Sequence, residues 1–190
     1  MMQIVLIGIG TGLAAALLFS SPIGGTSLAL PLFALTGLPI AVAGLGWTPL
    51  AAAVAVIAGS VAIFVMISPL AAGVFLFLFA LPMAWLAYLA GLWRQNGGDQ
   101  EWYPLARLFV NAAAGAAIGL LIVGYLVGFD PRGMADNITD ALLSWLSSRP
   151  DLEPLPTREE IEPFVRLNVA LLPYTLAAFT LIVQVFNLWL

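Results

Sequence analysis

The sequence of 190 residues contains no cysteine and no histidine, and all six of its basic residues are arginine. These absences exclude disulfides, thiol catalysis, Cys/His zinc sites and imidazole bases. Without lysine the chain has neither a P-loop lysine nor a Schiff-base lysine, and its serines have no basic partner. We therefore predict that the protein is not an enzyme, with no catalytic residues, no metal site and no cofactor.

Charged residues make up only 8% of the chain, whereas 62% of the residues are hydrophobic and the mean hydropathy is +1.06. A soluble domain carries about 25% charged residues, so lipid and neighbouring helices must surround most of these side chains. The net charge of −4 argues against nucleic acid as a partner. The composition predicts a protein of the lipid bilayer. The absence of lysine together with abundant alanine, glycine, leucine and proline suggests a GC-rich bacterial source, and we expect the protein to lie in the bacterial inner membrane.

Six apolar stretches are long enough to cross a bilayer, at about 20 residues per crossing. The predicted spans are 2–20, 28–47, 50–67, 70–93, 103–129 and 163–190. We therefore predict an all-α, polytopic membrane protein with one domain, residues 1–190. Pro31, Gly37 and Pro39 interrupt the second span, either as a simple kink or as unwound backbone that offers carbonyls to a substrate. Pro82 and Pro173 predict further kinks.

The longest polar segment, 130–162, is predicted to form an outer loop. Within it, Met134, Ile138, Leu142 and Trp145 recur at helical spacing, which predicts a short amphipathic helix lying at the membrane interface. An extended piece follows at Pro150, Pro154 and Pro156, and Thr157 and Glu160 fit a capping box. The carboxylates of this loop, chiefly at 136, 140, 159, 160 and 162, either form a solvated face or bind a cation.

The positions of the arginines predict the orientation. Arg94 and Arg107 flank the polar loop 94–101, which places that loop in the cytoplasm. Counting spans then puts the N-terminus in the cytoplasm and the segment 130–162 outside. The chain is still apolar at Phe186–Leu190, without the basic residues that follow a cytoplasmic span end, so we expect the natural protein to continue beyond Leu190.

Small and polar residues inside the spans supply the candidate sites. Gly8, Gly12 and Ala16 share one face of the first span, which suits either packing within the chain or docking of a partner subunit. Three amides, Asn111, Asn168 and Gln184, lie within the later spans, where each either bonds a neighbouring helix or contacts a ligand. We predict the first set as partner-docking residues and the second as ligand-binding residues. Mid-membrane carboxylates are absent, which argues against a proton-coupled or cation-coupled pump.

Five apolar stretches carry a resemblance to a known family. They are Gly8–Phe19, Leu30–Phe33, Leu38–Pro39, Gly44–Trp47 and Phe186–Leu190. Together they resemble the bacterial membrane-protein family DUF2232, also called YybS-like, over essentially the whole chain. That family is distantly similar to the substrate-binding S components of energy-coupling-factor vitamin transporters. Its members are often longer than this chain, in line with the expected continuation.

The resemblance implies six helices with both termini in the cytoplasm. It also implies that the small residues of the first span dock a coupling subunit and that the outer segment closes over a ligand. We therefore expect an S-component-like subunit that binds and helps to transport a small molecule together with a partner. The alternative is a membrane scaffold or an accessory subunit of a larger complex that transports nothing.

Overall fold

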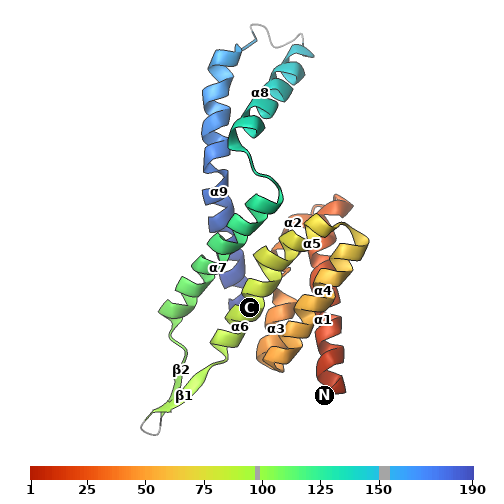
Figure 1. Cartoon of the computed structure of the whole chain (residues 1–190), viewed down its shortest axis with the longest axis vertical. Coiled ribbons are helices and arrows are strands. Elements are labelled where there is room, and N and C mark those ends of the chain that lie inside the picture. Colours follow the sequence, from red (N-terminus) through yellow and green to blue (C-terminus); the bar gives the residue numbers. More distant parts are fainter. Residues whose placement is uncertain (97–98, 150–154) are drawn as a thin grey trace.

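The structure is a computed structural model that describes residues 1–96, 99–149 and 155–190. Figure 1 shows a bundle of helices from which one short β-hairpin and one pair of helices project at opposite ends. In chain order the labelled elements are α1 (Met2–Ser20), α2 (Ala29–Ala34), α3 (Leu38–Gly46), α4 (Pro49–Met66), α5 (Pro69–Phe75), α6 (Leu81–Ala90), β1 (Trp93–Asn96), β2 (Asp99–Trp102), α7 (Leu105–Leu126), α8 (Pro131–Ser147) and α9 (Arg158–Trp189). A 3-10 turn at Ser21–Gly24 and a π-helical stretch at Leu76–Ala80 complete the described elements.

Among the described residues, six helical segments are long and apolar enough to cross a membrane, which confirms the all-α polytopic fold. They are α1 with its 3-10 turn, α2 with α3, α4, α5 to α6, α7, and α9. Local capping explains where α4 and α5 start. The side chains of Thr48 and Ser68 each accept a hydrogen bond from the backbone N–H three residues further on. In both helices a proline occupies the first helical position. Six crossings place both ends of the described chain on the same side of the bundle.

Several predicted boundaries differ from the structure. The fourth span ends at Ala90 instead of residue 93, because Trp93 and Trp102 pair as strands of an antiparallel hairpin. The polar stretch predicted as a loop is thus the β1–β2 hairpin, with Gly97 and Gly98 outside the described residues. The last helix begins at Arg158 instead of residue 163. Its start is the predicted capping box, in which the Glu160 carboxylate accepts a hydrogen bond from the Thr157 N–H at 2.8 Å.

Two of the spans depart from a regular α-helix, and prolines explain why. The second span breaks between α2 and α3 at residues 35–37, as Gly37 and Pro39 predicted. The fourth span stays helical but widens into the π-helical stretch just before Pro82. A proline has no N–H to donate to the carbonyl four residues earlier, so Pro82 leaves the carbonyl of Leu78 without its helical partner.

The small-residue face of α1 packs against α4 of the same chain. A Cβ placed on Gly8 would lie 2.6 Å from the Cβ of Val54, and one placed on Gly12 would overlap the carbonyl oxygen of Ala55. Ala16 is buried beside them. Of the two interpretations that the sequence left open, these contacts favour packing within the chain, because α4 already covers the face that partner docking requires.

The α8 helix confirms a helix in the segment 130–162 but not the placement predicted for it. It lies along the first half of α9 and extends beyond the other helices, instead of lying flat at the interface (Figure 1). Ala135 and Thr139 are buried and pack toward Ile161 and Val165. The predicted apolar stripe is only partly right, since Met134, Ile138 and Trp145 are exposed and the buried face is rotated away from them. Tertiary packing on α9 selects a face that helical spacing alone does not.

Candidate functional site

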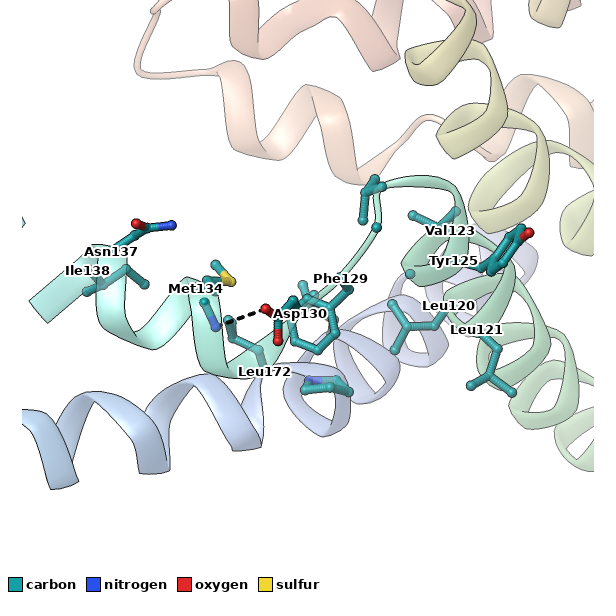
Figure 2. A pocket seen from close by; sticks show the side chains of 16 residues that line it. Leu120, Leu121, Val123, Tyr125, Phe129, Asp130, Met134, Asn137, Ile138 and Leu172 are labelled. Atoms are coloured by element: carbon teal, nitrogen blue, oxygen red, sulfur yellow. Dashed lines mark hydrogen bonds between the residues drawn. The ribbon is translucent and has the colours of Figure 1, made fainter.

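A cavity of about 1100 Å³ lies between the end of α7, the start of α8 and the middle of α9 (Figure 2). Its lining is mostly apolar, and the apolar side chains labelled in Figure 2 include Leu120, Leu121, Phe129, Met134, Ile138 and Leu172. Polar side chains reach the lining from Tyr125, Asp130 and Asn137. A second groove of about 460 Å³, wholly apolar, lies at the opposite end of the bundle between α3, α6, α7 and α9.

Local sequence signals build the walls of the α7–α8–α9 pocket. Gly128 ends α7 in the left-handed region, at φ 64°, a conformation that glycine adopts without strain. The chain then turns back, and the Asp130 carboxylate accepts hydrogen bonds from the N–H groups of Arg132 and Gly133, both at 3.1 Å, to cap α8. Pro173 interrupts the hydrogen bonding of α9 opposite this turn. The pocket therefore forms where three helical irregularities meet.

The helix lengths place the pocket at the membrane boundary. The 32 residues of α9 give a helix about 48 Å long at ~1.5 Å per residue, whereas the hydrocarbon core of a bilayer is about 30 Å thick. The roughly 20 residues ending at Trp189 suffice to cross that core, so Pro173 lies near its boundary on the α8 side. The α7 and α9 walls thus belong to candidate membrane spans, whereas α8 is not one of them.

The pocket lining holds few polar groups. Both oxygens of Asp130 already accept backbone hydrogen bonds, so this carboxylate is engaged as a helix cap. The remaining polar side chains of the lining are an amide and a phenol, those of Asn137 and Tyr125. Apolar walls with a few polar atoms are typical of ligand pockets, in which the polar atoms fix the orientation of the ligand.

The carboxylates above the pocket pair with arginines. Arg166 contacts Glu162 at 2.6 Å and Asp136 at 3.6 Å, and Arg158 contacts Glu162 at 3.2 Å and Asp140. Among the described residues, no three carboxylates gather as a metal site would require. These contacts favour the solvated, ion-paired face over cation binding. The expected extended piece at Pro150 and Pro154, with its two carboxylates, lies outside the described residues.

The three amides predicted to bind a ligand do not line this pocket and share no hydrogen-bond partner. Asn111 accepts a hydrogen bond from the Trp85 indole at 3.2 Å and donates to the Tyr103 hydroxyl at 3.4 Å, which ties α6 to the start of α7. Asn168 is exposed and donates to the carbonyl of Phe164 in its own helix. The structure therefore gives Asn111 the interhelical role that the sequence left as its alternative.

Gln184 and its neighbour Asn187 bond the two interrupted spans. The Gln184 amide nitrogen donates to the carbonyl of Leu78 at 3.3 Å, the acceptor that Pro82 leaves free. One turn on, the Asn187 amide nitrogen donates at 2.6 Å to the carbonyl of Ala34, the last residue of α2. Both side chains are 99% buried, and within the described parts of the chain their amide oxygens have no hydrogen-bond partner. Buried amides on α9 thus complete the backbone hydrogen bonding of broken helices.

Sequence reasoning missed the pocket because its walls come from three separate elements. An aspartate followed by a proline, as at Asp130 and Pro131, is a general signal of a helix start, and Pro173 was predicted to kink its span. Nothing in the sequence shows that these two positions lie side by side. Asn187 is likewise a polar residue deep in a span, but its partner Ala34 is 153 residues away.

Comparisons with known protein families, with curated proteins and with solved structures find no match to this chain. The apolar helices of the structure are those of a multi-pass membrane protein.

Proposed function

We propose that this protein is the ligand-binding membrane subunit of a small-molecule transport system and that its ligand is an amphiphile held between α7, α8 and α9. The observation that carries this proposal is the position of the pocket. Its α7 and α9 walls belong to membrane spans, and its α8 wall lies beyond them. A hydrocarbon tail fits against Leu121 and Leu172, and a polar head fits near Asn137, outside the hydrocarbon.

The chemistry of the lining supports an amphiphile over a fully polar solute. A polar ligand buried against leucine, phenylalanine and methionine would leave its own hydrogen-bonding groups unpaired, at a cost of about 1–3 kcal/mol for each group. An apolar tail gains about 0.8 kcal/mol for each methylene that it buries. The pocket volume of about 1100 Å³ accommodates a chain of this kind.

The resemblance to S components adds the expected partner and orientation. Those proteins also have six helices with both termini on one side, and they work with a coupling subunit. On this proposal the protein lies in a bacterial inner membrane with its N-terminus in the cytoplasm, and it binds its ligand without altering it chemically. Since α4 covers Gly8, Gly12 and Ala16, the partner would bind another surface.

Native mass spectrometry of the protein released from nanodiscs tests this proposal, with single-chain lysophosphatidylcholine as the probe. The variant Leu172→Trp fills part of the pocket, while the control Leu167→Trp places the same side chain on an exposed position of α9 that does not line it. We expect the wild-type protein and the control to retain the probe and Leu172→Trp to lose it. Equal retention by all three proteins would contradict a site in this pocket.

A second candidate function is that of an accessory subunit without a ligand. The observation that favours it is the α8–α9 pair, which extends beyond the other helices (Figure 1) and leaves Trp145 half exposed. In the same experiment, a protein partner that co-purifies while no amphiphile is retained would support this function over transport. Recovery of neither an ATPase partner nor a ligand would exclude the transport proposal.

A further inference from the structure

The β1–β2 hairpin is a ribbon with two chemically different faces. Trp93 pairs directly with Trp102, so both indoles lie on one face. The next pair, Arg94 and Glu101, lies on the opposite face, where the Arg94 Nε donates to the Glu101 carboxylate at 2.7 Å. The pairs after these follow the same alternation, with Gln95 and Gln100 beside the tryptophans and the remaining charge, Asp99, on the other face. One face is thus aromatic and uncharged, and the other is charged.

The hairpin lies at the end of the bundle where most of the tryptophans occur. Trp47 follows the end of α3, and Trp189 ends α9 and lines a groove with Ala90, the last residue of α6, and Leu105, the first residue of α7. Nearby on α6, the Trp85 ring packs in a tilted arrangement against Tyr88, with ring centroids 5.6 Å apart, and its N–H donates to the Asn111 amide oxygen. Five of the six tryptophans of the chain therefore lie at the hairpin end, and Trp145 lies at the other.

The tethers of the hairpin keep its aromatic pair near the ends of two membrane spans. Only Gly91 and Leu92 separate β1 from α6, and two residues separate β2 from α7. An extended chain covers about 3.3–3.6 Å per residue, so both tryptophans lie within about 10 Å of the ends of the spans. That distance corresponds to the polar interface on one side of a bilayer.

The β1–β2 hairpin is expected to have little stability in water alone. An isolated two-stranded hairpin is marginally stable in water, and both indoles here are 57% exposed within the protein. Tryptophan favours the headgroup region, where the ring contacts acyl carbons and the N–H finds a polar partner. The charged face of the ribbon is then free to meet water.

We infer that the β1–β2 hairpin is an interfacial anchor whose Trp93–Trp102 face binds the headgroup region of the bilayer. The lipid surface is the partner because the spans that flank the hairpin are already in contact with it. Arg94 and Glu101 point away from the lipid and limit the depth of insertion. The anchor holds the hairpin end of α6 and α7 at a fixed level in the membrane.

Fluorescence quenching in vesicles tests the anchor. The full chain is reconstituted in phosphatidylcholine and phosphatidylglycerol with bromine atoms either near the headgroup end or near the terminal methyl of the acyl chains. The emission of Trp93→Phe/Trp102→Phe is subtracted from that of the wild-type protein to isolate the pair. The matched control is Trp145→Phe, which removes a tryptophan of similar exposure from α8.

We expect bromines near the headgroup to quench the emission of the pair more strongly than bromines near the chain ends. The emission that Trp145→Phe removes should escape both. The inference is overturned if the pair escapes quenching at both depths, or if a co-purifying protein shields it in place of lipid. The single variants Trp93→Phe and Trp102→Phe give the same readout should the double variant not fold.

Discussion

Up to Trp93 the chain carries no charged side chain, whereas all six arginines and all ten carboxylates follow it. The helices before Trp93 are held by close approach of backbones, as where Gly12 of α1 meets Ala55 of α4. The helices after it use polar groups, with ion pairs between α8 and α9 and buried amides at the end of α9. The residues that line the pocket all belong to this second region.

The contrast between the helices before and after Trp93 follows from the medium that surrounds each set. In hydrocarbon there is no hydrophobic force between apolar helices, so small residues and dispersion contacts supply the stability. Beyond the hydrocarbon, α8 and α9 bury Ala135, Ile161 and Val169 in the ordinary way and place their charges at the rim. A substitution should therefore have very different effects in the two regions.

The largest effect is expected for Gly12→Leu in α1. A side chain at this position would overlap the carbonyl oxygen of Ala55 and crowd the backbone nitrogen of Gly59, and backbone atoms on both helices cannot move aside cheaply. We expect the free energy of unfolding to fall by about 3 kcal/mol or more. Unfolding by increasing denaturant in micelles measures it. The control is Gly10→Leu on the same helix, where no atom lies within 4 Å of the added Cβ. Equal stability of the two variants would show that α1 and α4 do not pack as described.

A smaller effect is expected for Asn187→Leu in α9. This change removes the hydrogen bond to the Ala34 carbonyl but also removes an amide oxygen that has no partner. Hydrogen bonds between helices in membranes contribute about 1 kcal/mol, so we expect a loss of that size in the same unfolding assay. Asn168→Leu serves as the control, since Asn168 is exposed and bonds only its own helix. A more stable Asn187→Leu would mean that the unpartnered oxygen costs more than the bond contributes.

Features that depend on a few neighbouring residues could be predicted from the sequence. The spans follow from hydropathy alone, and the glycine spacing of α1 correctly marks a packed face. The break at Gly37 and Pro39 follows from local backbone chemistry, and so does the capping box at Thr157. Each of these signals is contained within a few residues.

Contacts between residues that are distant in the sequence could not be predicted in this way. The pairing of Gln184 with Leu78 depends on a carbonyl freed by Pro82, and only the packed structure brings the two together. The same holds for the pocket, whose walls at Asp130 and Pro173 are distant in sequence. The hairpin at 93–102 was missed because its strands are too short and polar for a clear alternating pattern.

A weak effect is expected for Arg166→Gln in the α8–α9 pair. Its ion pairs with Asp136 and Glu162 involve a side chain that is half exposed, and such pairs contribute about 0.2–1 kcal/mol and are screened by salt. We expect faster amide hydrogen exchange in α8 at low salt and no difference from wild type at high salt. The control is Arg132→Gln at the start of α8, for which the described residues show no ion pair. A change in exchange that persists at high salt would point to packing instead of charge.

The smallest effect is expected at the hairpin, where the Arg94 guanidinium donates a hydrogen bond to Glu101 and lowers the pKa of that carboxyl by this bond and by charge attraction. Because the folded-state pKa is lowered, the stabilisation is present above the usual value of about 4.5 and is lost as the pH falls through the lowered value. The pair is exposed to solvent, so the change should be slight and confined to the hairpin. Nuclear magnetic resonance of the Trp93 and Trp102 indole N–H groups during acid titration measures it.

The variant Glu101→Gln is the control for that titration, since a glutamine keeps the shape of the side chain but does not titrate. We expect the acid-dependent shift of both indole signals to disappear in this variant. If the shift persists, it belongs to another group, and Asp99 on the same face of the ribbon is the next to test. If the shift is absent even in the wild-type protein, the lipid interface alone holds the hairpin, and the ion pair contributes nothing measurable to the anchor.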